Sequence, residues 1–371
     1  MKVLYDHQTF VYQNFGGISR YFVELAQNLN RHNLAQTSFS CLFSDNFYLK
    51  NSTLANPHSI LNGKFPGRMT VYNKIDRWRS RGNISKADYD IFHPTYYDDY
   101  FLGNKLNKPF VVTVHDMIHE LYPGLWPNQN DIVLQKKRVI NEASGIIAIS
   151  ENTKKDLLTI YPELQPEKIR VIHHGHSFAI SNSDDKGDFR KPYLLYVGMR
   201  EHYKNFDTLL ESLSEVFQIH KNHTLVCAGG GTFNESEMKK IQALNLEGKV
   251  VSISINGDAH LANLYQHADS FLYPSLYEGF GIPILEAFAS SCPVVISNSS
   301  CFPEVAANAA EYFDGNNVAD MVQVLINLIS NNGRKNELRE LGLKRLKLFS
   351  WKKTARETAE FYHEIIKNAS N

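Results

Sequence analysis

The chain has 371 residues, a length that favours two domains over a single hydrophobic core. Apolar residues make up 43% of it and charged residues 21%, as in a soluble globular protein. The formal net charge is zero, which excludes a global field that attracts nucleic acid or a membrane and leaves only local patches for such partners.

Cysteine usage and hydropathy favour the cytoplasm. The four cysteines, Cys41, Cys227, Cys292 and Cys301, form no CxxC pair and have no histidines at zinc spacing, so we expect reduced thiols. The N-terminal run MKVLYDHQTF holds too few apolar residues for a signal peptide, and no stretch of about eighteen apolar residues is present. We expect a cytoplasmic protein that is at most peripheral to a membrane.

The first predicted elements are a strand, a glycine turn and a helix. Residues 3–5 form the strand, Gly16 and Gly17 lie in the loop, and apolar residues recur at helical spacing from Ile18 to Leu29. This order is compatible with a phosphate-binding loop and, more simply, with an ordinary turn. It lacks GxGxxG and the acidic residue of a dinucleotide site, which argues against a nicotinamide oxidoreductase. Residues 32–62 give no clear prediction.

Residues 64–86 form a basic segment in which Tyr72 and Trp78 are interleaved with cations and Asp76 is the single acid. The cations are Lys64, Arg68, Lys74, Arg77, Arg79, Arg81 and Lys86. A solvated helix face is the simplest explanation. The alternative is a surface for anionic headgroups or for a lipid-diphosphate acceptor. No recognition module supports binding of nucleic acid.

Residues 110–114 are predicted to form a buried strand that ends at His115 and Asp116. The carboxyl tip of a parallel strand is where ligands bind in open α/β sheets, although a structural histidine is the usual alternative. Residues 146–149 form another strand, and Ser150 or Asn152 caps the next helix.

A strand over residues 170–172 precedes two adjacent histidines, His173 and His174. A third ligand at suitable spacing is missing, which argues against a metal there. Residues 177–191 are polar and without periodicity, which predicts a linker.

The second predicted domain opens with a buried strand over residues 194–197, followed by Gly198, Arg200 and Lys204 and then an amphipathic helix. A helix dipole disfavours positive charge at a helix start. A diphosphate ligand therefore explains the two cations better than ordinary surface exposure does.

A strand over residues 225–228 ends in Gly229, Gly230 and Gly231, and another follows at 250–253. Glycines at this edge of the sheet allow a nucleotide to approach the backbone closely.

The most informative stretch is residues 270–297, SFLYPSLYEGFGIPILEAFASSCPVVIS. It predicts a strand, a glycine-bearing loop, a helix that starts near Pro283, and a second strand. Two carboxylates, Glu278 and Glu286, frame the loop, and the amides of residues 280–282 lie between them. Carboxylates accept from sugar hydroxyls and amides bind oxyanions, which favours a polyhydroxylated ligand that carries phosphate. A plain N-terminal helix carboxylate is the alternative for Glu286.

This stretch resembles the signature of retaining family 4 glycosyltransferases of the GT-B fold, in which two glutamates separated by seven residues enclose Gly-Phe-Gly-Ile-Pro. The flanks YQHAD, PEVA and AEYF are similar as well. The resemblance implies an α/β protein of two Rossmann-like, doubly wound domains that face each other across a cleft. It implies an acceptor domain over residues 1–176 and a donor domain over 192–350. It also implies that the last helix, about 351–371, packs back on the first domain.

The resemblance also implies a set of site residues. Glu278 contacts the donor sugar and Glu286 the ribose, while Arg200 and Lys204 take the charge of the departing diphosphate. His115 lines the reacting face. The backbone around the donor comes from Gly16, Gly17, Gly198, Gly229, Gly230, Gly279, Phe280, Gly281 and Ile282.

Asp88, Tyr89 and Asp90 spell DxD, the metal-binding motif of the other large glycosyltransferase fold. They lead directly into residues 91–94, so we interpret them as the start of a strand and expect no metal and no other cofactor. The segments GGISRYFVEL and HDMIHELYP are similar to bacterial mannosyltransferases of surface-polysaccharide assembly.

We therefore expect a retaining hexosyltransferase that uses GDP-mannose, with a UDP-sugar as the alternative donor. The acceptor is a saccharide or a polyprenyl-diphosphate-linked saccharide. A sugar-nucleotide epimerase and a non-catalytic nucleotide-sugar binding protein are the rival interpretations.

Overall fold

The computed structural model describes residues 1–55, 57–58, 67–103, 106–178, 192–200 and 202–370. The chain folds as two α/β units. The first consists of Met1–Gly175 and Ser350–Asn371, and the second of His176–Phe349. Most of the predicted linker, residues 179–191, and Lys64 of the basic segment lie outside the described residues.

The first unit alternates strands and helices along the chain. Its strands are β1 (Lys2–Tyr5), β2 (Gln36–Phe39), β3 (Ile91–His93), β4 (Val111–Val114), β5 (Gly145–Ala148) and β6 (Ile169–Val171). Its helices are α1 (Gln8–Tyr12), α2 (Gly17–Arg31), α3 (Phe47–Lys50), α4 (Arg68–Lys86), α5 (Ile118–Leu121), α6 (Gln129–Glu142), α7 (Glu151–Ile160) and α15 (Trp351–Ala369), with a 3₁₀ turn at Pro166–Lys168.

All strand pairs of the first unit are parallel. They form two three-stranded ladders, β2-β1-β3 and β4-β5-β6, which a parallel bridge between Phe92 and Phe110 joins. Side chains alternate between the faces, so that Val3 and Tyr5 pack on one side of β1 and Leu4 on the other. This is the doubly wound, Rossmann-like arrangement predicted from the sequence.

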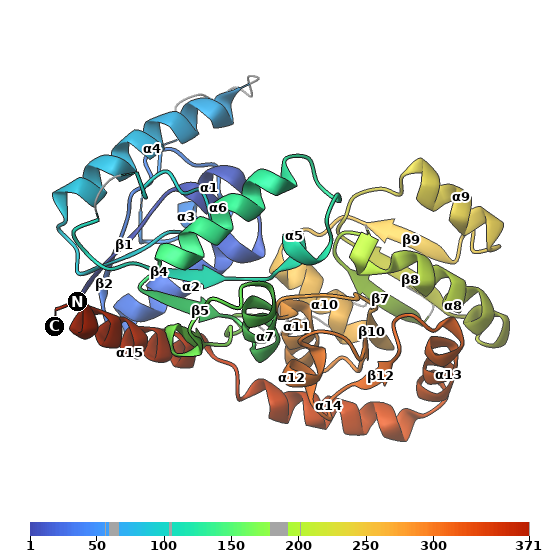
Figure 1. Ribbon diagram of the computed structural model, residues 1–371. Coiled ribbons are helices and arrows are strands. Elements are labelled where there is room, and N and C mark those ends of the chain that lie inside the picture. Colours follow the sequence, from blue (N-terminus) through green and yellow to red (C-terminus); the bar gives the residue numbers. More distant parts are fainter. Residues whose placement is uncertain (56, 59–66, 104–105, 179–191, 201, 371) are drawn as a thin grey trace. The chain divides into compact units, whose positions relative to one another are not determined.

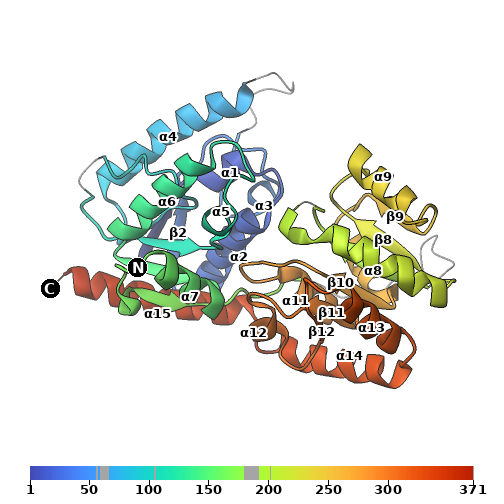
Figure 2. The same cartoon turned by 45° about the vertical axis from the view of Figure 1, so that its right-hand side comes forward.

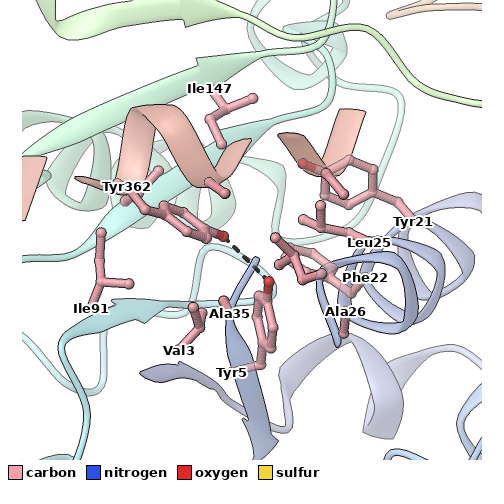
Figure 3. Packing of buried hydrophobic residues seen from close by; sticks show 14 of the residues in the cluster. Val3, Tyr5, Tyr21, Phe22, Leu25, Ala26, Ala35, Ile91, Ile147 and Tyr362 are labelled. Carbon is pink, nitrogen blue, oxygen red and sulfur yellow. Dashed lines mark hydrogen bonds between the residues drawn. The ribbon is translucent and has the colours of Figure 1, made fainter. Parts of the chain in front are cut away.

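The C-terminal helix α15 belongs to the first unit, where it packs beside α2. Figures 1 and 2 show it, in dark red, along the blue and green elements of that unit. Its Tyr362 Oη lies 3.3 Å from Tyr5 Oη of β1 within an apolar cluster (Figure 3). Tyr362 Oη also lies 2.5 Å from Nδ1 of the buried His93. These contacts fix the last helix to the centre of the sheet.

The second unit has a six-stranded parallel sheet of order β12-β11-β10-β7-β8-β9. Its strands are β7 (Tyr193–Val197), β8 (Thr224–Ala228), β9 (Val250–Ile253), β10 (Ser270–Tyr273), β11 (Val294–Ser297) and β12 (Glu311–Phe313). Its helices are α8 (Phe206–Ile219), α9 (Glu235–Ala243), α10 (Asp258–His267), α11 (Ile282–Ala289), α12 (Phe302–Ala306), α13 (Val318–Ile329) and α14 (Asn332–Leu346), with a 3₁₀ turn at His202–Lys204.

Helices cover both faces of the second sheet. Leu194 and Tyr196 of β7 pack with α8 and α13 on one face. On the other face, Tyr193 donates to the carbonyl of Leu264 in α10 over 2.7 Å, and Tyr265 of α10 packs edge-on against Phe271. Both domains therefore have the predicted α/β architecture, and burial on both faces explains why their strands are continuous apolar runs.

Most predicted elements are confirmed to within one or two residues, including the strand–loop–helix–strand unit over 270–297. Ser150 rather than Asn152 caps α7, since its Oγ accepts from the amide of Thr153 over 3.0 Å. The four cysteines are buried and free, as expected. Among the described residues, no helix is both long and apolar enough to cross a bilayer.

Candidate functional site

The second sheet changes winding direction between β7 and β10. Strands β8 and β9 extend it on one side of β7, while β10, β11 and β12 extend it on the other. Loops that leave adjacent strands in opposite directions open a crevice at the carboxyl ends, which is where ligands bind in such sheets. Lys204 follows β7 and Glu278 follows β10, so the fold places both at this point.

Lys204 and Glu278 form an ion pair there. The distance from Lys204 Nζ to Glu278 Oε1 is 2.6 Å, and the two side chains are 17% and 15% exposed. Burial by itself would lower the pKa of Lys204, but the charge of Glu278 and the neighbouring Tyr203 outweigh it, so that the pKa is raised. Lys204 therefore stays charged at neutral pH, in a position that solvent still reaches.

The Glu278 loop is held from the next crossover. The hydroxyl of Ser300 accepts from the amide of Glu278 over 3.2 Å and donates to the carbonyl of the same residue over 2.5 Å. Cys301 Sγ donates to that carbonyl over 3.1 Å. On the other side, the amide of Leu276 donates to the carbonyl of Tyr203 over 2.8 Å. The loops that carry Lys204 and Glu278 are thus tied to their neighbours through backbone bonds.

The remainder of the signature leads into α11. Gly279, Phe280 and Gly281 are buried, and Phe280 packs edge-on against Phe349. Gly281 has φ +89°, a conformation that glycine adopts without strain, and it starts the helix at Ile282. Glu286 is 7% exposed one turn further on, and Tyr265 Oη donates to its Oε2 over 3.4 Å.

Arg200 is committed to protein groups rather than open to solvent. Its Nε donates to Glu237 Oε1 over 2.8 Å, and its side chain is 3% exposed. The remaining guanidinium nitrogens donate to the carbonyls of four consecutive residues, Gly229 to Thr232, over 3.0 to 3.2 Å. Arg200 therefore neutralises and orders the carbonyl side of the glycine loop after β8.

That loop requires glycine for two separate reasons. Gly230 has φ +69°, and a Cβ there would come within 2.7 Å of both Arg200 Nη1 and the carbonyl oxygen of Gly198. Gly198 and Gly229 join the strand ends, since the amide of Gly198 donates to the carbonyl of Ala228 in β8 over 3.0 Å and the amide of Gly229 to that of Ile253 in β9 over 3.3 Å. Three of the glycines predicted for donor binding, Gly198, Gly229 and Gly230, thus form one glycine edge, next to the loop that carries Lys204.

Gly16 and Gly17 lie in the first unit, at the start of α2. A side chain at Gly16 would collide with Gln13, whose Oε1 accepts from the amide of Ser19 over 3.2 Å. Gln13 therefore satisfies one of the free amides of this helix terminus, the group that a phosphate would otherwise bind. Sequence reasoning missed Gln13, because a glutamine in a loop carries no distinctive signal.

His115 follows β4, as predicted, and is 6% exposed. Its ring packs edge-on against Tyr21 with centroids 5.1 Å apart, and its Nε2 is buried without a hydrogen-bond partner. Burial, aided by His93 and Lys136, lowers the pKa of His115 to about 3. The imidazole is therefore neutral at physiological pH and presents an unsatisfied nitrogen rather than a charge.

The structure thus brings Lys204, Glu278 and the glycine edge together in the second unit. Ser300 and Glu237 were not predicted, and only their long-range contacts reveal them. The DxD triplet lies at the amino end of β3, where Asp88 pairs with Lys2 over 2.6 Å. It is the start of a strand, as interpreted. Within the described residues no group of three His, Cys, Asp or Glu is placed to hold a metal ion.

Two family models match the chain in succession. Residues 15–177 match glycosyltransferase family 4, and residues 181–345 match glycosyl transferases group 1.

Several bacterial and archaeal relatives are similar over large parts of the chain. An uncharacterized glycosyltransferase of Methanocaldococcus jannaschii is 28% identical over 60% of this chain and 61% of its own length. O-antigen chain mannosyltransferase B of Escherichia coli is 25% identical over 74% of each chain. An O-antigen chain mannosyltransferase of Salmonella typhimurium is 30% identical over 54% of this chain and 55% of its own. The chain thus matches less than two thirds of the length of the first and third of these relatives.

Solved structures share the fold over nearly the whole chain. Sucrose-phosphate synthase from Thermosynechococcus elongatus has a TM-score of 0.76 at 16% identity, covering 99% of both chains. The Anabaena protein HepE in complex with UDP-glucose has a TM-score of 0.76 at 16% identity, covering 98% of this chain and all of its own. Together with the two family models, this places the chain in the glycosyltransferase family of group 1 and family 4 enzymes with the GT-B fold.

Proposed function

We propose that the protein is a retaining, metal-independent hexosyltransferase that moves mannose from GDP-mannose to a saccharide or polyprenyl-diphosphate-linked saccharide in cell-surface polysaccharide synthesis. The observation that carries the proposal is the Lys204–Glu278 pair at the crevice of the second sheet. A cation and a carboxylate at 2.6 Å offer one partner to a diphosphate and one to sugar hydroxyls. Two relatives named as O-antigen mannosyltransferases support the sugar.

Lys204 supplies the positive charge for the departing diphosphate. In the unliganded protein Glu278 neutralises it. When a donor binds, its phosphates pair with Lys204 in place of Glu278. The carboxylate of Glu278 then accepts hydrogen bonds from the hydroxyls of the sugar. Positive charge fixed where the leaving group develops negative charge lowers the barrier without a metal. Glu286 binds the ribose, and the amides after Gly281 and Gly198 approach the nucleotide.

Arg200 has a supporting role in this proposal. Its guanidinium holds the carbonyls of residues 229–232 and Glu237, so that the glycine edge keeps its shape before the donor arrives. His115 lines the acceptor side as a neutral imidazole, since burial lowers its pKa to about 3. It can exchange one hydrogen bond with a sugar hydroxyl but does not act as an acid.

Retention follows from attack on the face from which the diphosphate leaves. The bond from the anomeric carbon to the phosphate oxygen breaks while the acceptor oxygen forms its bond on the same face. The proton of the acceptor hydroxyl passes to the departing phosphate oxygen, which Lys204 stabilises. This route requires no protein nucleophile, whereas double displacement requires a carboxylate beneath the anomeric carbon.

A UDP-sugar is the second candidate donor, since a structure with the same fold was solved in complex with UDP-glucose. A thermal-shift panel of GDP, UDP, GDP-mannose and UDP-glucose separates the two, because a ligand that binds the folded state raises the melting temperature. We expect GDP-mannose to stabilise the protein and to yield mannosylated acceptor in the presence of EDTA. Stabilisation by UDP and not by GDP would mean that the donor is a UDP-sugar rather than GDP-mannose. Loss of transfer in EDTA would contradict the metal-independent mechanism.

The exposed side of α4 supports a cytoplasmic protein that binds the membrane peripherally and draws its acceptor from there. Trp78 is 79% exposed and is flanked by the exposed cations Lys74, Arg79 and Arg81. The single acid of this helix, Asp76, is buried and accepts from the amides of residues 42 and 43. The protein is expected to co-sediment with anionic vesicles. The double variant Trp78→Ala with Arg79→Ala should co-sediment less. Equal binding by the variant would exclude α4 as the membrane surface.

A further inference from the structure

Two aromatic side chains of the first unit are presented to solvent in contact with each other. Phe15 is 68% exposed and Phe47 is 49% exposed. Their rings stack with centroids 5.0 Å apart and an interplanar angle of 26°, and Tyr48 meets both rings edge-on. Large apolar side chains that gather at a surface, rather than scatter singly, mark a binding site.

The backbone around this aromatic pair holds the two rings in place. The amide of Phe47 donates to the carbonyl of Asn14 over 2.9 Å. Asn46 donates from its side chain to the carbonyl of Gln13 over 2.6 Å and accepts from the amide of Leu49, which caps α3. The loop before α2 and the short helix α3 are thereby fastened together. Since these bonds exist before any ligand arrives, binding to the rings loses little conformational entropy.

The aromatic pair lies at the end of the first sheet where loops leave the strands. The chain passes from β1 through α1 directly to Phe15 and then into α2, and Figures 1 and 2 show α1 and α3 close together. Polar residues lie beside the rings, since Asn14 accepts from the amide of Phe47 and Gln13 accepts from the side chain of Asn46, both through their carbonyls. Arg20 adds a cation, with its Cζ 5.9 Å from the centre of the Tyr48 ring.

We propose that Phe15 and Phe47 form a stacking platform for a pyranose ring of the acceptor glycan; this proposal rests on the proposed transferase function. One face of a pyranose consists of C–H bonds, which fit the negative face of an aromatic ring, while its hydroxyls point sideways toward polar neighbours. An exposed aromatic pair with polar residues next to it in the chain and Arg20 beside the neighbouring Tyr48 matches that division. The exposed face of α4 is different, since cations surround its single tryptophan, as an anionic lipid surface requires.

The charge near the rings further limits which ligands fit this surface. Arg20 lies beside the aromatic cluster and makes the local charge positive, which favours a neutral or anionic glycan over a cationic one. The structure thus assigns acceptor binding to Phe15 and Phe47.

The test compares Phe15→Ala, Phe47→Ala and the double variant with the wild-type protein. Leu134→Ala is the matched control, because it removes an exposed apolar side chain, 58% exposed, from α6 of the same unit. The probes are α-mannotriose and maltotriose as soluble acceptors. Saturation-transfer NMR measures their binding without a donor, and turnover at saturating donor measures the acceptor KM. Melting temperatures verify that the variants fold.

Removal of either ring is expected to raise the acceptor KM roughly threefold to tenfold, while kcat, donor KM and donor hydrolysis stay unchanged. Leu134→Ala should match wild type in every readout. Unchanged acceptor KM and unchanged NMR signals in the double variant would overturn the platform. So would loss of binding to phosphatidylglycerol vesicles with normal trisaccharide binding, because the rings would then contact lipid.

Failure of the proposed function is distinguishable from failure of the platform. If the wild-type protein neither binds nor hydrolyses any nucleotide-sugar, the transferase proposal fails, while the NMR signals of the trisaccharides still report on the rings. Trisaccharide signals that are absent from wild type, or equal in the double variant, would reject the platform whatever the donor result.

Discussion

Both units have parallel, doubly wound sheets, but their strand orders differ, and they use the switch in strand order differently. In the second unit the carboxyl ends of β7 and β10 present Lys204 and Glu278 to solvent. In the first unit the equivalent position lies between β1 and β3, and the buried Asp6 fills it. Asp6 accepts from the amide and hydroxyl of Thr95 over 2.8 and 2.7 Å, and from Tyr100 over 3.1 Å. Two sheets of the same general class thus carry a partly exposed ion pair in one unit and a closed polar core in the other.

This difference separates two kinds of carboxylate. Asp6 is fully buried, and the protein itself provides its partners, so its role is structural. Glu278 pairs with Lys204, has the buried Tyr273 hydroxyl as a further hydrogen-bond partner, and remains 15% exposed, so a ligand can replace the lysine. A carboxylate with an exchangeable partner is suited to binding, whereas one with several fixed donors is suited to joining loops. Substitutions in the two units should therefore affect different properties.

The largest effect on activity is expected from Glu278→Gln or Lys204→Met. Each removes one charge from the crevice of the second unit, and kcat/KM for transfer should fall roughly 10²-fold to 10³-fold, as for loss of a group that stabilises developing charge. The melting temperature without ligand should fall by no more than a few degrees, because the charge that loses its partner is largely buried but still reaches solvent. Steady-state kinetics and thermal denaturation measure the two quantities.

Glu235→Gln is the matched control for that experiment. It removes a carboxylate that also lies 2.6 Å from a lysine of the second unit, Lys239, but on the exposed side of α9. Its kinetics should equal those of wild type. If Glu278→Gln turned over at a near-normal rate, the crevice would not be the catalytic site.

Asp6→Ala should have the opposite signature. It leaves the donors of Thr95, Tyr100 and Gln8 buried without an acceptor, which should lower the free energy of unfolding of the first unit by about 3 kcal/mol or more. Urea denaturation measures this loss. Binding of nucleotide-sugar to the second unit should persist under native conditions.

Asp88→Ala is the control for Asp6→Ala, since Asp88 is 83% exposed at the other end of the same sheet. It should leave the urea midpoint where it is in wild type. A stable Asp6→Ala protein would mean that this network does not hold the first unit together, and the contrast between the two sheets would be lost.

The next largest effect is expected from acid, which should lower the free energy of unfolding of the first unit. The four histidines that are buried among the described residues, His7, His93, His115 and His174, all belong to it. Burial lowers the pKa of His93 and of His115 to about 3, from an unfolded value near 6.5. Below pH 6.5 the unfolded state therefore binds protons that the folded state excludes. Stability should be constant above this pH and fall as pH drops toward 3.

Linkage gives about 1.4 kcal/mol per pH unit for each such histidine. Urea midpoints at pH 7.5, 6.5, 5.5 and 5.0 measure the slope in a range where ordinary carboxylates remain ionised. A midpoint that is constant from pH 7.5 to 5.0 would contradict the burial of these imidazoles.

The sequence predicted the fold well because buried parallel strands are continuous apolar runs, as in β4, β7 and β10. Strand β2 was missed, because its residues Gln36–Phe39 are polar and alternate between exposed and half-buried. Lys204 and Glu278 could be named from local pattern, since each follows a recognisable strand.

Their supporting residues were beyond the reach of local pattern. Glu237 lies 37 positions after Arg200, and Ser300 lies 22 after Glu278. A serine or glutamate at such distances carries no periodic or motif signal, so only tertiary contacts reveal it. The commitment of Arg200 to protein carbonyls and the burial of Asp6 were unpredictable for the same reason.

The smallest effect is expected from Ser300→Ala, which tests whether the crevice depends on a fixed loop. The hydroxyl of Ser300 bonds both the amide and the carbonyl of Glu278, and the substitution removes both bonds while the thiol of Cys301 stays on that carbonyl. Glu278 should then sample several positions, and kcat should fall by roughly threefold to tenfold, since one net hydrogen bond of about 1 kcal/mol is lost. Donor affinity should change less than kcat, because Lys204 keeps its place. Ser299→Ala, which alters the adjacent hydroxyl, should show neither change. If Ser300→Ala lowered stability without affecting kcat, Ser300 would support the fold rather than the orientation of Glu278.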